Sequence, residues 1–316
     1  MSAKIVQTGF GGPEVLELVD QAPPAAEELA ADEVLIRVAY AGVNPIDVMT
    51  RTGGGVAGLL TLPFTPGWDL AGTVEAVGSQ VTALSAGDRV FGMARFPRAG
   101  AAYAQHAVVP AIDLAPTPDT LTDAAAAALP LAAMTAWQAF ADTTHVAAGQ
   151  QVLIAGAGGG VGHLAVQIAH HLGATVTAVA GAAKHDWLRG LGADRTVDYT
   201  DQAALTALAD QPVDVALTVV GGDTGRHALA AVRPGGVLIS LVGAPAELRA
   251  AADAAGVRVA TTAVHTERAW LTEIAHLAAA KALAPEVAHI VDLADAAQAH
   301  RLIEAGHVQG KIVLRA

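Results

Sequence analysis

Residues 152–181 have the sequence VLIAGAGGGVGHLAVQIAHHLGATVTAVAG, and they indicate the fold more clearly than any other segment of the chain. Its first four residues are continuously apolar, as in a strand that helices cover on both faces. A run of glycines follows, then a helical pattern over 161–172 and a second β-type run at 175–180. A strand, a glycine turn, a helix and a second strand in this order predict a dinucleotide-binding βαβ unit within a doubly wound α/β fold.

The spacing of the glycines suits a phosphate site. Gly156, Gly159 and Gly162 recur at every third position, with further glycines between them. Glycine lets the backbone turn tightly, approach a pyrophosphate closely and pack the next helix hard against the strand. The helix over 161–172 then directs free N–H groups and the positive end of its dipole at the phosphate.

The residue that follows the second strand indicates which dinucleotide is bound. An NAD site usually ends this strand in Asp or Glu, which accepts hydrogen bonds from the ribose hydroxyls and repels a 2′-phosphate. This chain has Gly181 there, and Lys184 stands three residues later. The missing carboxylate and the nearby cation favour NADPH. The alternative is that Lys184 is only a solvated helix residue, and Asp186, past the strand end, is interpreted as surface.

Composition excludes several classes of function. The chain has 316 residues, 53% hydrophobic and 15% charged, which predicts two domains with substantial cores. Its net charge of −12 argues against a nucleic-acid partner and an anionic membrane surface. No basic segment opens the sequence, and the alanine-rich run at 124–141 is interpreted as a buried helix rather than a membrane span. We therefore expect a soluble, cytoplasmic protein.

The chain has no cysteine and twelve histidines. Disulfides, thiol catalysis and thiolate-bound zinc are therefore excluded. His163 and His170 lie two turns apart on one expected helix, and His170 is adjacent to His171. Neither of these two pairs has the spacing expected of metal ligands. We expect no metal site and interpret these histidines as solvent-facing or cofactor-side.

The sequence pattern changes at the glycine turn. Residues 4–110 alternate short β-type runs, as at 33–40 and 89–92, with Gly/Pro turns, which indicates a mostly antiparallel β domain. From 122 onward strands and helices alternate, which indicates a parallel sheet. The tail, with a last strand at 311–314, returns to the first pattern. We expect one domain over 1–121 and 284–316, and a second over 122–283.

A series of short motifs runs along the whole chain. They are Asn44-Pro-Ile-Asp47, Pro66-Gly-Trp-Asp-Leu-Ala-Gly72, Gly87-Asp-Arg-Val-Phe-Gly92, Leu129-Pro-Leu-Ala-Ala-Met-Thr-Ala-Trp137, the glycine turn, Gly192-Ala-Asp194, Pro234-Gly-Gly236 and Gly310-Lys-Ile-Val-Leu314. Together and in this order they resemble the zinc-independent quinone oxidoreductases of the medium-chain dehydrogenase/reductase (MDR) superfamily.

This resemblance implies a GroES-like β domain and a Rossmann domain, NADPH as the cofactor, hydride transfer to a conjugated acceptor and a homodimer. The zinc-dependent branch carries a Cys near position 42 to 44 and Gly-His-Glu where this chain has Gly67-Trp68-Asp69. The resemblance therefore implies zinc-independent chemistry. Quinones and enones need less help from a Lewis acid, because their conjugated carbonyl already spreads the charge that a hydride brings.

Matched by position, the resemblance also implies roles for residues. Asn44 and Asp47 would line the nicotinamide end of the cleft, and Thr135 would approach the nicotinamide or its phosphate. The alternative for the first pair is an Asn-Pro turn in which Asp47 holds the loop. The implied catalytic set is Asn44, Asp47 and Thr135, and the expected cofactor-binding set is Gly156, Gly159, Gly160, Val161, Gly162, Gly181, Lys184, Tyr199, Val242, Gly243 and Lys311.

Within that set, each group faces a different part of the cofactor. Gly160 and Val161 would contact the pyrophosphate, and Tyr199 would stack near the adenine or reach the 2′-phosphate. Val242 and Gly243 would hold the nicotinamide amide, and Lys311 would steady the cleft edge.

One departure from the family concerns the acceptor. Many of these quinone reductases carry Tyr where this chain has Met49, which cannot donate a proton or a hydrogen bond. A 2-enal or 2-enone reductase of the same branch is therefore a strong alternative to a quinone reductase. An enoyl reductase or cyclase of secondary metabolism and a non-catalytic NADPH-binding protein are further alternatives.

The run at 256–264 is rich in β-branched residues and is predicted to be the last strand of the Rossmann sheet. Pairing this edge with its own copy across a two-fold axis would satisfy both edges, so we expect a homodimer. The alternative is a monomer in which the helix over 266–282 or a loop covers the edge.

Overall fold

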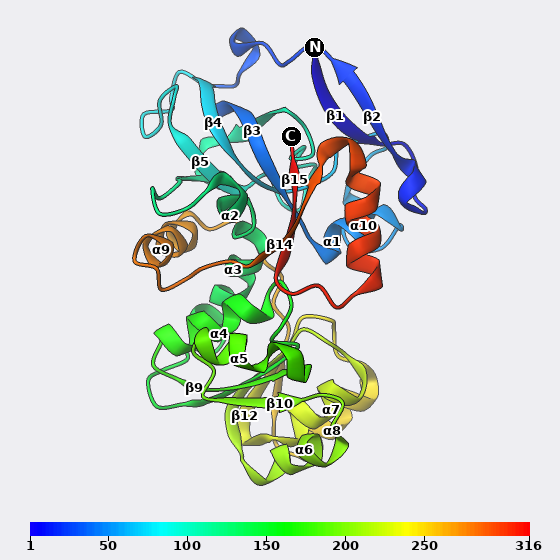
Figure 1. Ribbon diagram of the computed structural model, residues 1–316, viewed down its shortest axis with the longest axis vertical. Coiled ribbons are helices and arrows are strands. Elements are labelled where there is room, and N and C mark those ends of the chain that lie inside the picture. The colour runs from blue at the N-terminus through cyan, green and yellow to red at the C-terminus, as the bar shows by residue number, and fades with distance from the viewer. The chain divides into compact units, whose positions relative to one another are not determined.

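The computed structural model describes residues 1–316 and divides into two compact units. Unit 1 comprises Met1–Met134 and His265–Ala316, and unit 2 comprises Thr135–Val264. Figure 1 shows both, with unit 2 in green to yellow. None of the helices is both long and apolar enough to cross a membrane.

Unit 1 is built on a mainly antiparallel sheet. Strand β3 (Glu33–Val43) pairs with β4 (Asp69–Val77), with β6 (His106–Pro110) and with β15 (Lys311–Arg315). Only β14 (Val287–Asp292) and β15 run parallel to each other. The remaining strands are β5 (Arg89–Met93), β7 (Leu114–Pro116) and a separate pair, β1 (Ser2–Gln7) and β2 (Leu16–Gln21). The C-terminal strand thus completes a sheet that the N-terminal segments begin.

Short helices pack around this sheet. They are α1 (Pro45–Arg51), α2 (Asp123–Ala127), α9 (Arg268–Ala279) and α10 (Ala296–Ala305), whereas α3 (Pro130–Trp137) contains the division between the two units. Helix α1 packs against α10, α2 packs on β3 and β4, and α9 packs on β7. The contacts of α2 and α9 place both helices in unit 1, so the chain divides at 134/135 and 264/265, whereas the sequence predicted a division at 121/122 and 283/284.

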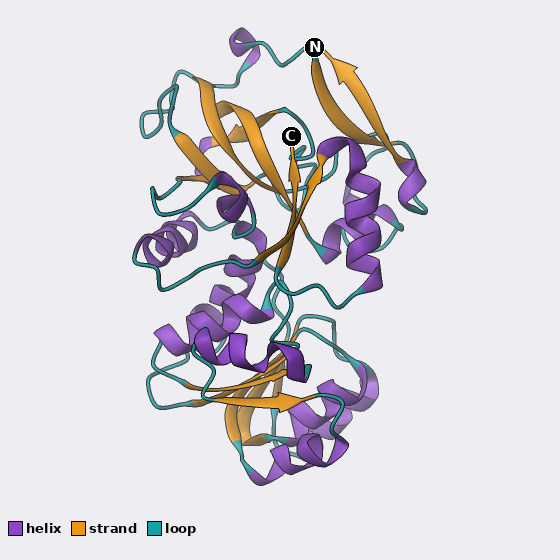
Figure 2. Cartoon of the chain, in the orientation of Figure 1, coloured by secondary structure: helices purple, strands orange, loops and turns teal.

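Unit 2 contains a six-stranded, fully parallel sheet in the order β10-β9-β8-β11-β12-β13. The strands are β8 (Gln151–Ala155), β9 (Thr175–Ala180), β10 (Arg195–Asp198), β11 (Val213–Thr218), β12 (Val232–Ser240) and β13 (Arg258–Ala260). Helices lie on both faces of this sheet (Figure 2): α4 (Gly162–His171), α5 (His185–Gly190), α6 (Gln202–Thr206), α7 (Gly222–Ala230) and α8 (Ala246–Ala254). The predicted α/β fold with a doubly wound sheet is confirmed.

Two elements differ from their prediction. The helix expected over 122–145 is broken, because Pro130 starts a new helix and a π-helical segment, Gln138–Thr143, ends it. The strand expected at 256–264 is the last of its sheet, but it is only three residues long. Its β-branched residues beyond 260 are not assigned to a strand.

Candidate functional site

The glycine turn follows β8, at the point where the strand order of the sheet reverses. Gly156 has a φ of +87°, a conformation that glycine adopts without strain. A Cβ atom on Gly162 would lie 2.2 Å from the carbonyl oxygen of Gly156, which is backbone and cannot swing aside. Helix α4 therefore starts in contact with the turn, and only glycine at 162 allows it.

Backbone N–H groups are available at the start of α4. The N–H of Gly159 donates to the Gly156 carbonyl at 3.3 Å and closes the turn. Gly160 and Val161 are half-buried, and their N–H groups are not donated to another backbone carbonyl. Free donors at the positive end of a helix suit an anionic phosphate, so this part of unit 2 fits the pyrophosphate of a dinucleotide.

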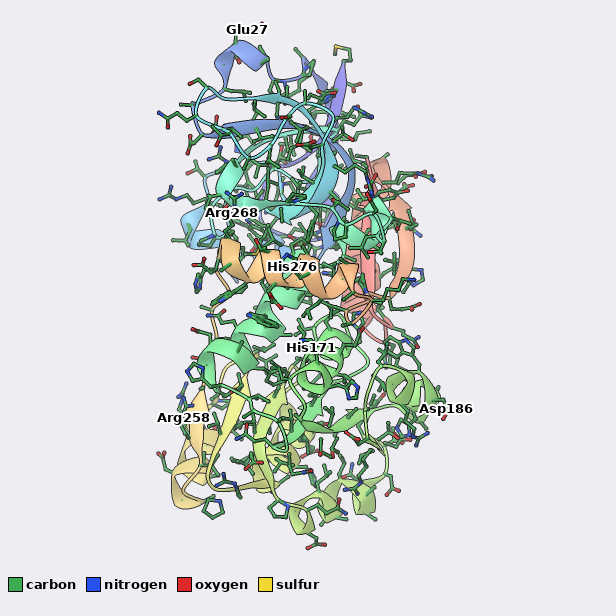
Figure 3. All side chains as sticks on the ribbon, turned by 90° about the vertical axis from the view of Figure 1, so that its left-hand side faces the viewer. Glu27, His171, Asp186, Arg258, Arg268 and His276 are labelled. Carbon is green, nitrogen blue, oxygen red and sulfur yellow. The ribbon has the colours of Figure 1, made fainter.

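The end of β9 brings together the residues expected at the adenosine end. A Cβ built on Gly181 would lie 3.5 Å from Cε1 of Tyr199, whose side chain is half exposed. Lys184 reaches back to the glycine turn, where its Nζ donates to the carbonyl of Gly158 at 3.3 Å, and burial lowers the pKa of this lysine. Asp186 instead points outward, fully exposed and paired with Arg189 (Figure 3), as expected for a surface residue.

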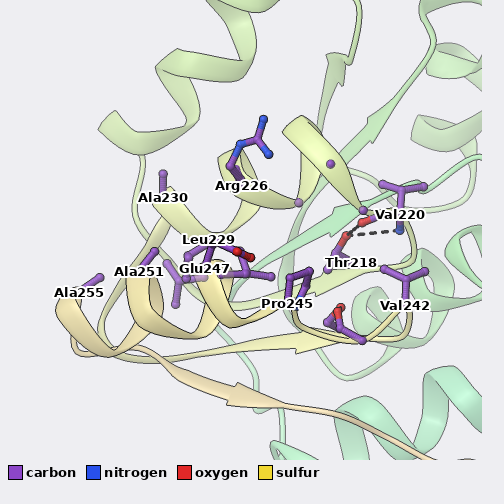
Figure 4. A pocket seen from close by; sticks show the side chains of 17 residues that line it. Thr218, Val220, Arg226, Leu229, Ala230, Val242, Pro245, Glu247, Ala251 and Ala255 are labelled. Carbon is purple, nitrogen blue, oxygen red and sulfur yellow. Dashed lines mark hydrogen bonds between the residues drawn. The ribbon is translucent and has the colours of Figure 1, made fainter.

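A cavity of about 760 Å³ in unit 2 runs between α7 and α8, from the carboxyl ends of β11 and β12 to Ala230 and Ala255 at the other ends of the helices (Figure 4). Val242 and Gly243 line it beside Thr218 and Ser240. The Thr218 hydroxyl donates to the Val220 carbonyl, and the Ser240 hydroxyl donates to the Gly243 carbonyl at 2.5 Å. These bonds shape the two loops at one end of the cavity, and this end lies where a parallel sheet usually binds its ligand.

A buried polar cluster occupies unit 1 next to the start of α1. The Asn44 amide donates from Nδ2 to the Asp69 carboxylate at 2.9 Å and accepts from the Lys311 ammonium. The second Asp69 oxygen accepts the N–H of Leu131 at 2.8 Å, and Lys311 Nζ lies 3.7 Å from Asp69 Oδ2. Burial is the main cause that raises the pKa of Asp69 and lowers the pKa of Lys311.

Asp47 connects this cluster to a second set of buried groups. Its Oδ2 accepts the backbone N–H of Asn44 at 2.7 Å and the Tyr103 hydroxyl at 3.1 Å. Burial raises the pKa of Asp47 to about 7. Tyr103 is also 3.3 Å from Nε2 of His300, and burial lowers the pKa of this histidine to about 3, so it is neutral near pH 7. Buried atoms without a hydrogen-bond partner include Asp47 Oδ1, His300 Nδ1 and Nη1 of Arg51.

The comparisons with known proteins identify the family. Residues 30–119 match the family model described as alcohol dehydrogenase GroES-like domain, and residues 191–314 match the one described as zinc-binding dehydrogenase. A solved structure titled as the quinone oxidoreductase from Coxiella burnetii covers 100% of both chains at 34% identity, with a TM-score of 0.91. The chain belongs to the quinone oxidoreductase branch of the MDR superfamily.

Two plant relatives of this MDR chain carry more specific names. The 2-methylene-furan-3-one reductase of Solanum lycopersicum is 36% identical over 75% of this chain, and the chloroplastic NADPH-dependent alkenal/one oxidoreductase of Arabidopsis thaliana is 35% identical over 76%. The matched region spans only 61% and 62% of the length of these relatives. Their activities are therefore considered for this chain only as a proposal.

The geometry of this MDR chain separates the predicted residues into two sets. The glycine turn, Gly181, Lys184 and Tyr199 gather around the carboxyl ends of β8 and β9, and Val242 with Gly243 lines the cavity. Lys311 lies in the polar cluster of unit 1 and directs its ammonium at Val43, Asn44 and Asp69. Thr135 is buried near the end of α3.

Asn44 and Asp47 are only 1% exposed. Asp47 holds the Asn-Pro turn by accepting the N–H of Asn44, which is the structural role that the sequence offered as the alternative to a role at the nicotinamide. Sequence reasoning missed the partners that surround them. Asp69 lies in the motif Pro66–Gly72, so the sequence could have marked it as a candidate site residue. No sequence pattern links Tyr103 with His300, because they are 197 residues apart in the chain.

The pKa of Asp47 predicts how stability changes with pH. Because the native pKa of about 7 exceeds the ordinary 3.8, the contribution of Asp47 is fully present below pH 4 and is lost as pH rises through 7. Asp47→Asn keeps an acceptor oxygen but cannot ionise. Relative to this variant, wild type is expected to lose about 2–3 kcal/mol of unfolding free energy between pH 5 and pH 8. Urea unfolding at both pH values measures this, and parallel pH profiles for the two proteins would contradict it.

Proposed function

We propose that the chain is an NADPH-dependent oxidoreductase that transfers hydride to a conjugated carbonyl, in a quinone or an enone, without zinc. The observation that carries this proposal is the cradle at the ends of β8 and β9. It combines free N–H donors at Gly160 and Val161 with Lys184, and it has no carboxylate at Gly181 to repel a 2′-phosphate.

The cofactor would be held by residues that unit 2 already arranges. Gly160 and Val161 bind the pyrophosphate, Lys184 and Tyr199 bind the 2′-phosphate and adenosine, and the loop with Val242 and Gly243 receives the nicotinamide amide. When bound, NADPH supplies the hydride. The family resemblance supports placing Asn44, Asp47 and Thr135 at the nicotinamide end, with Lys311 positioning Asn44 through its side-chain oxygen.

Zinc-independent chemistry is supported by the use that the fold makes of Asp69. This residue stands where the zinc-dependent branch carries the glutamate of its Gly-His-Glu motif, and the chain has no cysteine. Both Asp69 oxygens accept hydrogen bonds within unit 1, from Asn44 and from the N–H of Leu131. A conjugated acceptor fits such a site, because its own π system spreads the incoming charge and hydrogen-bond donors or water stabilise the enolate.

An enone or alkenal is the second candidate acceptor, and the exposed residue at position 49 favours it. Met49 is 52% exposed and offers no hydrogen bond to a quinone oxygen. The names of the two plant relatives agree with this reading. NADPH with deuterium at its transferable position separates the classes. A reduced alkenal keeps the label on carbon, whereas a hydroquinone forms but loses the label from its exchangeable O–H groups. A chain that binds NADPH but forms neither product would be non-catalytic.

Cofactor preference is predicted from Lys184. Lys184→Ala removes the ammonium that reaches the glycine turn, so NADPH affinity should fall by about 1–3 kcal/mol, the size of a charge-assisted hydrogen bond, while NADH affinity changes little. Fluorescence titration with both cofactors measures this, with Lys281→Ala in unit 1 as the control. An equal loss for both cofactors, or an NADH preference in wild type, would overturn the assignment.

We further propose a homodimer through the free edge of β13. This strand pairs only with β12, so its other edge has no partner strand within the chain. Thr261→Pro, placed directly after the strand, is expected to shift the mass measured by light scattering from two chains to one. A wild-type mass of one chain, or a dimer that survives the proline, would show that this edge is not the interface.

A further inference from the structure

His163 is a buried histidine directly behind the glycine turn, in the first turn of α4. Its Nδ1 lies 2.8 Å from the carbonyl oxygen of Gly159. Because a carbonyl only accepts, Nδ1 carries the hydrogen and donates it. The same carbonyl accepts the backbone N–H of His163 at 3.2 Å. The Gly159 carbonyl is therefore held inward by two donors, which fixes the peptide that leads to Gly160.

The ring of His163 also contacts α5. It stacks on the indole of Trp187, with ring centroids 5.7 Å apart and the planes inclined by 26°. Trp187 lies three residues after Lys184, so the stacked ring supports the helix whose N-terminal end carries that lysine. His163 thereby links two parts of the cradle that are distant in sequence.

Lys184 makes the second link between the same two parts. Its Nζ donates to the carbonyl of Gly158, the neighbour of the carbonyl that His163 holds. Two adjacent carbonyls of the glycine turn are thus bound by different elements. The carbonyl of Gly159 accepts from the His163 ring in α4, and the carbonyl of Gly158 accepts from Lys184, which follows β9. A leucine would fill the volume of His163 without the cost of burying ring nitrogens, so the hydrogen bond is the feature that a histidine adds.

We propose that His163 is a positioning residue for 2′-phosphate recognition. It sets the distance between the glycine turn and Lys184 by holding Gly159 with Nδ1 and supporting Trp187 with its ring. The inference rests on the proposed NADPH site. Its consequence is specific: loss of the ring contacts misplaces Lys184, which NADPH needs and NADH does not.

Three variants separate the two contacts. His163→Leu keeps the volume but removes both the donor and the stacked ring, His163→Asn keeps a donor near the position of Nδ1 without the ring, and Trp187→Leu removes the stacking partner but leaves the donor. His171→Leu, at an exposed position of the same helix, is the matched control. The dissociation constants of NADPH and NADH are measured by fluorescence titration, and the melting temperature is measured without cofactor.

His163→Leu, which loses both contacts, is expected to weaken binding of NADPH by about tenfold or more and of NADH by less than about threefold. His163→Asn and Trp187→Leu, which each keep one contact, are expected to weaken NADPH by about three- to tenfold, again with less effect on NADH. Equal losses for both cofactors that follow the melting temperature would overturn the proposal, as would unchanged NADPH affinity. If His163→Leu does not fold, Trp187→Leu and His163→Asn still decide. If wild type binds no NADPH, the proposed function fails first and the inference with it.

Discussion

Lys311→Met is expected to lower the free energy of unfolding by about 3–5 kcal/mol, because it leaves buried carboxylates without their counter-charge. Lys311 is 3% exposed, and its ammonium contacts the carbonyl of Val43, the Asn44 amide oxygen and Asp69. Methionine has a similar length but no charge, so the change tests the charge rather than the packing. Urea unfolding of both proteins at pH 7 measures the loss.

Lys281→Met is the control for this prediction, since Lys281 is an exposed lysine of the same unit. It should change stability by less than about 0.5 kcal/mol. The defect of Lys311→Met should also shrink at pH 5, because Asp47, with a pKa of about 7, is then protonated and needs no cation nearby. A loss no larger than that of the control would show that the cluster does not depend on this lysine.

Gly162→Ala is expected to disrupt the cofactor site. The added Cβ would meet the Gly156 carbonyl oxygen at 2.2 Å and the Ala157 Cα at 2.7 Å, so α4 must move away from the turn. This overpacking should cost about 1–3 kcal/mol of stability. The displaced N–H groups of Gly160 and Val161 should lower NADPH affinity by about tenfold or more, which corresponds to ~1.4 kcal/mol.

The control for this substitution is Gly190→Ala, at the end of α5, where nothing lies within 4 Å of an added Cβ. It should leave NADPH affinity unchanged and leave stability unchanged or slightly raised, because alanine has a higher helix propensity than glycine. Calorimetry and cofactor titration give both values for each variant. Wild-type affinity in Gly162→Ala would mean that the helix start does not form the phosphate site.

The parts of the molecule that follow from local sequence could be predicted closely. The strand expected at 152–155 is β8 without its first residue, and the strand expected at 175–180 coincides with β9. Both agree because apolar runs and glycines determine the conformation of their own segment. Gly181 and Lys184 were predicted to share a cofactor site with the glycine turn, because the parallel strands that precede them end at the same edge of the sheet. The clearest errors were at 122–145 and 256–264, where a proline and the sheet edge decided the outcome.

The polar cluster of unit 1 could not be predicted, because its members come from separate elements. Asp69 begins β4, Tyr103 precedes β6 and His300 lies in α10, and only the folded sheet brings them to Asp47. Lys311 was predicted from its motif to belong to the cofactor-binding set and to steady the cleft edge, and its ammonium contacts Asn44 and Asp69, which that prediction did not name as its partners. A motif marks that a residue matters to a family, but the partner of its side chain depends on long-range packing.

NADPH-dependent reduction of a conjugated carbonyl without metal is tested directly by one assay. After dialysis against a chelator, NADPH oxidation is followed with a 2-enal, with para-benzoquinone and with the matched saturated aldehyde. We expect that at least one conjugated acceptor is reduced at the rate seen before dialysis and that the saturated aldehyde is not reduced. Reduction of the saturated aldehyde at a comparable rate, or activity that is lost on dialysis and restored by zinc, would contradict it.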